Sequence, residues 1–183
     1  MLGYYNVEPL RTPDEINQFK SALHDLGGDR NKFLFTLGIN TGLRISDLVK
    51  LKVGDIYGKP YTDLLERKTQ KKRRLHLIAI QGDIVEYCVD KDPGDFLFPS
   101  RTGNGHISTT QAYRILVAAG EWIGRKDIGT HTMRKTFGYH YYKKTKDVYT
   151  LMEIFGHASP TITKKYIGIR EDEIAESLKN FRL

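Results

Sequence analysis

Residues 131–166 read HTMRKTFGYHYYKKTKDVYTLMEIFGHASPTITKKY, and this stretch decides how the chain is organised. Because His131 and Arg134 are three positions apart, they share one face of a helix predicted to begin near Thr130. Gly156 is expected to end the following helix directly before His157. The polar groups that ordinary packing does not require are therefore predicted at helix termini, and they are His131, Arg134, His157 and Tyr166.

Cationic groups beside a hydroxyl suit chemistry on a phosphodiester. Positive charge stabilises the non-bridging oxygens while another oxygen attacks phosphorus in line. A tyrosine phenol has a pKa of about 10, so it needs nearby cations to attack as phenolate at neutral pH. Residues 131–166 contain both the cations and the tyrosine hydroxyl that this chemistry requires. The sequence has no glycine-rich phosphate-binding loop and no cluster of residues at metal-ligand spacing. No metal and no cofactor are expected.

The length and composition of the chain predict one domain of moderate size. The chain has 183 residues and a single cysteine, Cys88, which rules out an internal disulfide. No apolar run approaches the roughly 18 residues of a membrane span, and residues 1–15 lack the order of a secretory signal. We therefore expect a cytoplasmic protein without membrane contact.

The net charge of +7 suggests a polyanionic partner without naming it. On charge alone, a solvated basic surface is an equally good interpretation. The position of the charges is more informative, because residues 67–74 concentrate six cations: Arg67, Lys68, Lys71, Lys72, Arg73 and Arg74. We predict that this segment faces the polyanionic partner.

The hydrophobic pattern predicts an α+β fold that is mainly helical. A capping box at Thr12–Glu15 begins the first helix, and Gly27-Gly28 ends it. Over residues 55–80 the period becomes extended, which predicts a small three-stranded antiparallel sheet with its last turn at residues 68–71. The remaining chain reads as helices, the last over residues 171–181.

Arg44 lies among apolar neighbours, so its guanidinium is expected at a fixed place. Seen alone, such an arginine is more often a structural ion-pair partner than a catalytic group. Asp47, three residues on, is either that partner or a group that orients Arg44 toward a phosphate. Ser46 is expected to cap the short helix that follows.

Four motifs in this order resemble those of the tyrosine recombinase and phage integrase family: TGLRISDL (residues 41–48), RKTQKKRRLHL (67–77), HTMRKTF (131–137) and FGHASPTITKKY (155–166). The resemblance covers about residues 12–181 and corresponds to that family's C-terminal catalytic domain. Each motif alone is weak evidence for the family. A specific signal comes from six positions in the right order, namely Arg44, Lys68, His131, Arg134, His157 and Tyr166.

The resemblance implies roles for individual residues. Arg44 and Arg134 would clamp the scissile phosphate, with His131 and His157 completing the phosphate-binding and acid–base set. Lys68 would protonate the departing 5′ oxygen, and Tyr166 would attack phosphorus to leave a 3′-phosphotyrosyl link. Asp47 matches a supporting acidic position, where glutamate is more usual in the family.

The resemblance also implies an organisation and a partner. The partner would be double-stranded DNA, faced by the hairpin cations Arg67, Lys71, Lys72, Arg73 and Arg74. Residues 1–183 would form one catalytic domain without the N-terminal domain that helps most family members clamp double-stranded DNA. Residues 171–183 carry an apolar stripe that either folds back on its own domain or docks on a neighbouring protomer of a tetramer on DNA. Two alternatives stay open, namely DNA relaxation as in type IB topoisomerases and a noncatalytic DNA-binding domain.

Overall fold

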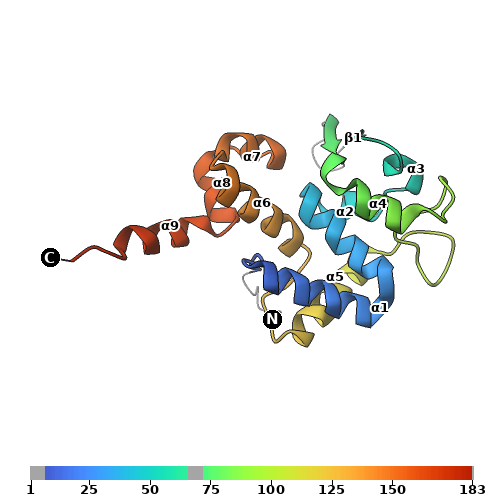
Figure 1. The fold of residues 1–183 in the computed structure, drawn as a ribbon, viewed down its shortest axis with the longest axis horizontal. Helices are drawn as coiled ribbons and strands as arrows, with labels where there is room; N and C mark the ends of the chain where they lie inside the picture. Colours follow the sequence, from blue (N-terminus) through green and yellow to red (C-terminus); the bar gives the residue numbers. More distant parts are fainter. Residues whose placement is uncertain (1–6, 66–71, 183) are drawn as a thin grey trace.

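The computed structural model describes residues 7–65 and 72–182. Figure 1 shows how the helices and strands of these residues are arranged in space. They are α1 (Pro13–Thr41), α2 (Ile45–Leu48), α3 (Val53–Ile56), β1 (Tyr61–Leu65), β2 (Lys72–His76), the 3₁₀ turn η1 (Ile78–Ile80), α4 (Gln81–Cys88), α5 (Thr109–Trp122), α6 (Thr132–Thr145), α7 (Val148–Phe155), α8 (Pro160–Tyr166) and α9 (Ile169–Leu178). The predicted α+β class, mainly α, is confirmed.

Helix α1 begins at the capping box that the sequence predicts. The Thr12 side chain accepts the Glu15 amide, and the Glu15 carboxylate accepts the Thr12 amide. Gly27 and Gly28 depart from helical geometry, so α1 consists of two helical segments joined at a kink. The predicted break at this glycine pair is confirmed.

The sheet has two antiparallel strands among the described residues rather than the predicted three. Tyr61 lies opposite His76, and Leu65 lies opposite Lys72. The preceding residues turn into helix α3 instead, because the Asp55 carboxylate accepts the Lys52 amide at 2.8 Å and stabilises a helical start. The predicted turn at residues 68–71 lies outside the described residues.

Two apolar clusters organise the molecule. The larger lies among α1, α4 and α5, where Phe33 stacks on Tyr87 with ring centroids 4.2 Å apart. The smaller is formed by α6, α7, α8 and the start of α9. Helix α6 joins them, since Met133 belongs to the first cluster and Tyr139 to the second. Side chains near the start of α6 therefore lie where the two clusters meet.

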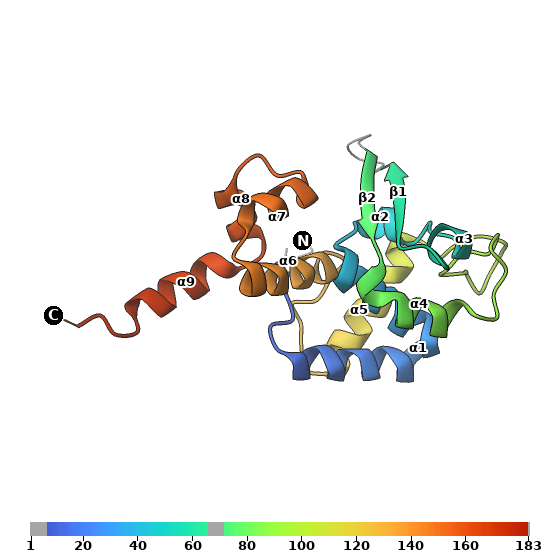
Figure 2. The ribbon, with the colours of Figure 1, turned by 45° about the horizontal axis from the view of Figure 1, so that its top comes forward.

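Helix α9 extends away from the rest of the molecule in both Figure 1 and Figure 2, and the C-terminus lies at its far end. The hairpin of β1 and β2 rises beside α2 (Figure 2). Within the described ranges, no helix combines the length and the apolar character needed to cross a membrane.

Candidate active site

The turn between α1 and α2 sets the position of Arg44. Helix α1 ends at Gly42, whose φ of 61° is left-handed and whose amide donates to the Gly38 carbonyl. A Cβ added at Gly42 would lie 2.5 Å from Cδ1 of Phe137, so glycine is required here for both conformation and space. Arg44 then occupies the N-cap position of α2. The prediction that Ser46 caps this helix is wrong, because Ser46 lies inside it.

Arg134, in the first turn of α6, is the most deeply buried cation of the site, with 3% of its surface exposed. It donates through Nη1 to the Gly42 carbonyl and through Nη2 to the Phe155 carbonyl at 2.9 Å. Its guanidinium also lies 4.2 Å from the centroid of the Phe155 ring. These contacts offset the cost of burying a charge and fix the side chain in one orientation.

Arg44 reaches the same carbonyl from the N-cap position of α2. Its Nη2 donates to the Phe155 carbonyl at 3.4 Å. This carbonyl ends α7, where the helix dipole favours cations. Two permanent positive charges thus converge at one helix terminus, an arrangement suited to an anion with several oxygens, such as a phosphodiester.

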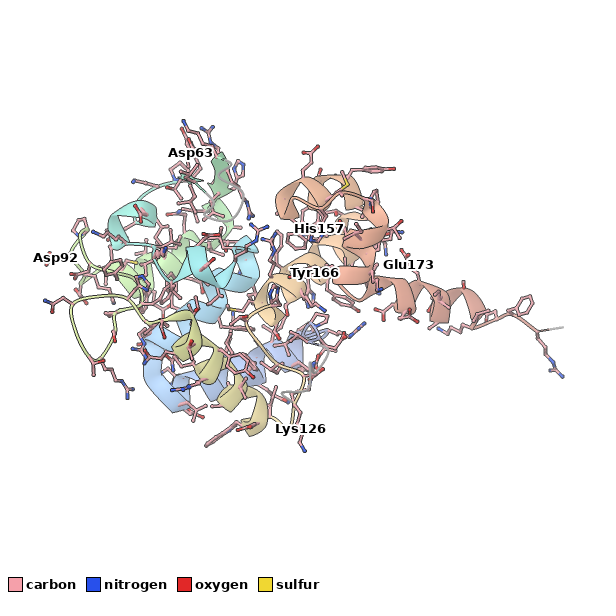
Figure 3. The ribbon with its side chains drawn as sticks, turned by 180° about the vertical axis from the view of Figure 1, so that it is seen from behind. Asp63, Asp92, Lys126, His157, Tyr166 and Glu173 are labelled. Atoms are coloured by element: carbon pink, nitrogen blue, oxygen red, sulfur yellow. The ribbon has the colours of Figure 1, made fainter. Side chains whose placement is uncertain are left out.

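Tyr166 is the last residue of α8. The helix begins with Ser159, whose side chain accepts the Ile162 amide, and with Pro160 in its first turn. This start directs Tyr166 toward the beginning of α6, where its hydroxyl lies 3.0 Å from Nδ1 of His131. Its ring meets the His157 ring edge-on at a centroid distance of 5.0 Å. Figure 3 shows His157 and Tyr166 on the side of α7 and α8 that faces the rest of the molecule.

Burial and charge act in opposite directions on the Tyr166 phenol. Burial raises its pKa and is the largest effect, whereas the charges of Arg134 and Arg44 and a side-chain hydrogen bond with Arg134 lower it. The net shift is upward. In this state the hydroxyl is therefore protonated at neutral pH, and its deprotonation depends on groups that take the proton as it reacts.

His157 directly follows the left-handed Gly156 that ends α7. Its Nδ1 lies 3.0 Å from Oγ1 of Thr163 in α8, so the imidazole joins the two helices. Burial, followed by the charges of Arg134 and Arg44, lowers the pKa of His157. The ring is accordingly neutral near pH 7 in this state.

Comparison with known proteins identifies the kind of chain that carries this site. A model described as the phage integrase family matches residues 11–173. The chain belongs to this family. The resemblance stated from the four motifs is confirmed, and with it the prediction of a DNA breaking and rejoining enzyme of the integrase and tyrosine recombinase type.

Individual relatives place this phage integrase family member more closely. The probable integrase/recombinase YoeC of Bacillus subtilis is 43% identical over 176 residues, which are 96% of this chain and 97% of YoeC. The tyrosine recombinase XerC of Herpetosiphon aurantiacus is 28% identical, and the match covers 87% of this chain but 54% of XerC. The chain thus spans nearly all of one relative and about half of the other.

Solved structures of the family share the fold. The XerA recombinase superposes with a TM-score of 0.70 at 21% identity, covering 100% of this chain and 66% of XerA. A lambda integrase dimer bound to a COC′ core site gives a TM-score of 0.69 at 22% identity, covering 92% of this chain and 62% of the integrase. At these identities the likeness concerns the fold alone.

Five of the residues predicted for the integrase site come together in space, and they are Arg44, His131, Arg134, His157 and Tyr166. Asp47 lies in α2, where its amide donates to the Arg44 carbonyl at 2.9 Å, and its supporting role stays a prediction. Lys68, with Arg67 and Lys71, lies outside the described residues.

The described hairpin cations differ from one another. Lys72 is exposed. Arg74 forms a two-point ion pair with Asp63 at 2.8 and 2.9 Å, whereas Arg73 donates to the Thr41 carbonyl at 2.7 Å. Both arginines thus contact protein groups, and DNA binding by Lys72, Arg73 and Arg74 stays a prediction.

Two residues that contact the tyrosine ring were not predicted from the sequence. The Phe155 ring lies 5.5 Å from the Tyr166 ring and also faces Arg134. Lys135 places its ammonium 5.4 Å from the centroid of the Tyr166 ring, and it donates to the Val7 carbonyl. Burial lowers the pKa of Lys135. The sequence signal for both is their position inside the motifs: Lys135 directly follows Arg134, and Phe155 lies two residues before His157.

Proposed function

We propose that this chain cleaves and rejoins double-stranded DNA at specific sites through a covalent 3′-phosphotyrosyl intermediate on Tyr166. One observation carries the proposal: the Tyr166 hydroxyl lies 3.0 Å from His131 beside two arginines that converge on the Phe155 carbonyl. A nucleophile, a proton acceptor and an anion site thus lie together. We place the reaction in the cytoplasm and treat the chain as one catalytic unit.

The proposed reaction balances without nucleotide hydrolysis. The Tyr166 oxygen attacks phosphorus as its proton passes to His131, and the bond from phosphorus to the 5′ oxygen breaks. The departing 5′ oxygen takes a proton from Lys68. Arg44 and Arg134 bind the non-bridging oxygens, whose charge rises in the transition state. Rejoining reverses each step, because a 5′ hydroxyl attacks the phosphotyrosine and Tyr166 recovers its proton.

Solved relatives support DNA as the substrate class. Among structures of this fold are a XerH recombinase bound to its difH substrate after cleavage and a Tn1549 transposon integrase with circular-intermediate DNA. The net charge of +7 on this chain fits a polyanion.

Covalent trapping tests the nucleophile. Wild type is incubated with duplexes that carry the sequence of the host replicon and contain a nick. The nick lets the cleaved end diffuse away, so the covalent adduct accumulates and is measured after denaturation of the protein. We expect an adduct with wild type and none with Tyr166→Phe, which removes only the attacking oxygen. Tyr149→Phe is the matched control, because Tyr149 is 67% exposed on α7 and should still form the adduct.

Three results would contradict the proposal in different ways. An adduct retained by Tyr166→Phe would identify another nucleophile. Plasmid relaxation without exchange between sites would favour topoisomerase-like chemistry. Salt-sensitive DNA binding by wild type without an adduct on any duplex of the replicon would favour a noncatalytic binder.

We further propose that α9 docks on a neighbouring copy and builds a tetramer on DNA. Ile174 and Leu178 of α9 are 43% and 56% exposed and lie four positions apart on one face of the helix. Phe181, 66% exposed, lies beyond the end of α9 at Leu178, so the helix is shorter than the predicted 171–181 at this end. Tyr149 and Ile162, 67% and 49% exposed on α7 and α8, offer an apolar counterpart. Burying such side chains between copies is favourable, which supports exchange of this helix.

The mass of the complex on a DNA with two binding sites tests this assembly. We expect wild type to form tetramers and Ile174→Ser with Leu178→Ser to remain at lower stoichiometry. Glu176→Ser with Lys179→Ser is the control, since it alters an exposed ion pair on the same helix and leaves the apolar stripe intact. Equal assembly of both double variants would indicate that α9 does not join the copies.

A further inference from the structure

Strand β2 carries two consecutive arginines that face different surroundings. Exposure alternates along the strand, so Lys72, Arg74 and His76 are exposed while Arg73 and Leu75 turn inward. Arg74 is paired with Asp63 on the facing strand and lies 4.2 Å from the centroid of the Tyr61 ring. The inward arginine therefore does something other than add charge to the outer face of the hairpin.

Arg73 bonds the end of α1. Its Nη2 donates to the Thr41 carbonyl at 2.7 Å, across 32 positions of sequence. Thr41 is the last residue of α1 and is 3% exposed, so its carbonyl is one of the helix-end acceptors that lack an intrahelical donor. A guanidinium suits this place because it meets both the hydrogen-bonding need and the negative end of the helix dipole.

The next carbonyl of the chain is bonded by another arginine. Arg134 of α6 donates to the Gly42 carbonyl, directly after the one that Arg73 holds. Two successive peptide groups are thus fixed by arginines from two separate elements. Arg44 is two residues after Gly42 in the chain, and its side chain donates to the Phe155 carbonyl, to which Arg134 also donates. The place from which Arg44 extends therefore depends on both contacts.

We propose that Arg73 is a positioning residue for the recombination reaction. By holding the Thr41 carbonyl it ties the hairpin to the turn that carries Arg44, so the two approach a bound phosphodiester in one fixed relation. The hairpin stands beside α2, which begins directly after Arg44 (Figure 2). This proposal rests on the proposed function, and it assigns to Arg73 a role distinct from the DNA contact predicted from its charge.

The experiment separates binding from chemistry in Arg73→Ala, with Arg74→Ala as the matched control. Both variants remove one charge from the same strand, but only the first leaves the Thr41 carbonyl without this donor. We expect Arg73→Ala to slow adduct formation at saturating DNA about 10- to 100-fold. Its DNA dissociation constant and the salt dependence of that constant should change no more than in Arg74→Ala.

Chemical rescue adds a readout that lost charge on the DNA face would not give. Guanidinium ion, at concentrations far below those that unfold proteins, can occupy the space left by the Arg73 side chain. We expect it to restore part of the adduct rate in Arg73→Ala and to leave the rate of Arg74→Ala as it was. A rate intact at saturation, with weakened and less salt-sensitive binding, would identify Arg73 as a phosphate contact and overturn the proposal.

Backbone hydrogen exchange tests the tie without any DNA. Amides of residues 42–48 should exchange faster in Arg73→Ala than in wild type and Arg74→Ala, with the amides of α5 as a reference for overall folding. Unchanged exchange in this segment would overturn the proposal even if the adduct rate falls. Because this measurement needs no cleavage, absence of an adduct in wild type would count against the proposed function alone.

Discussion

At the scale of single residues, the two arginines of the site divide their work unequally. Arg134 is almost entirely buried and holds the carbonyls of Gly42 and Phe155, whereas Arg44 is partly exposed and contacts the Phe155 carbonyl at a longer distance. A guanidinium has five N–H donors, so Arg134 can hold protein carbonyls and still offer donors to a phosphate. The residue that best suits anion binding is also part of what keeps α1, α6 and α7 together.

Arg134→Lys should therefore reveal a structural cost that Arg44→Lys does not. A lysine ammonium cannot span the two carbonyls, so one of these buried acceptors loses its bond to residue 134, and the free energy of unfolding should fall by about 2–3 kcal/mol. Arg44→Lys should cost less than about 1 kcal/mol, because that side chain is more exposed and its bond to Phe155 is longer. Urea unfolding of both variants measures the difference. Equal losses would show that Arg134 contributes no more than Arg44 to the fold.

The identity of the site residues could be predicted from the sequence, but their surroundings could not. The order of the four motifs was enough to select Arg44, His131, Arg134, His157 and Tyr166, which the fold brings together. Phe155 was missed because an apolar residue at a helix end reads as ordinary packing. Contacts of this kind join residues through space and leave no periodic pattern.

At the scale of elements, two helix ends were predicted correctly from the sequence. Thr12 and Gly156 act through local chemistry, a side-chain acceptor and a left-handed backbone, which a few neighbouring residues determine. The number of strands was predicted wrongly although the cause is also a local interaction. Residues 53–56 adopt a helical turn because Asp55 bonds back to Lys52, and this interaction outweighs the extended pattern of the tyrosines that follow.

Gly42→Ala tests how tightly the turn before Arg44 is constrained. An alanine must adopt a left-handed conformation there and also displace the Phe137 ring, so we expect a loss of about 3 kcal/mol in unfolding free energy. Gly58→Ala is the matched control, since its φ of 70° is similar but nothing lies within 4 Å of an added Cβ. It should cost about 1 kcal/mol, the conformational part alone. Similar losses at the two positions, measured by thermal or urea unfolding, would mean that the contact with Phe137 relaxes at little cost.

At the scale of the whole molecule, the base of α9 is anchored by polar contacts as well as apolar ones. The Asp172 carboxylate accepts Nη1 of Arg11 at 2.6 Å and the Tyr139 hydroxyl at 3.0 Å. One residue on, Glu173 accepts the Tyr142 hydroxyl at 2.7 Å. The segment before α1, helix α6 and helix α9 thus meet at one point. Tyr166 lies three residues before α9, so this anchor also bears on the helix that carries the nucleophile.

Asp172→Ala should loosen this anchor without unfolding the molecule. It removes the acceptor shared by Arg11 and Tyr139, and we expect the amides of α9 to exchange about tenfold faster, which corresponds to about 1.4 kcal/mol. The free energy of global unfolding should fall by less than about 1 kcal/mol, because roughly a third of each ion-pair side chain is exposed and water screens the pair. Glu176→Ala is the control, since it removes a carboxylate from the same helix at a position 76% exposed. If both variants leave the exchange of α9 amides unchanged, packing of Ile167 and Ile169 in the smaller cluster is sufficient to hold α9. The direction in which α9 leaves the molecule is then set by these apolar contacts rather than by the acidic residues of its first turn.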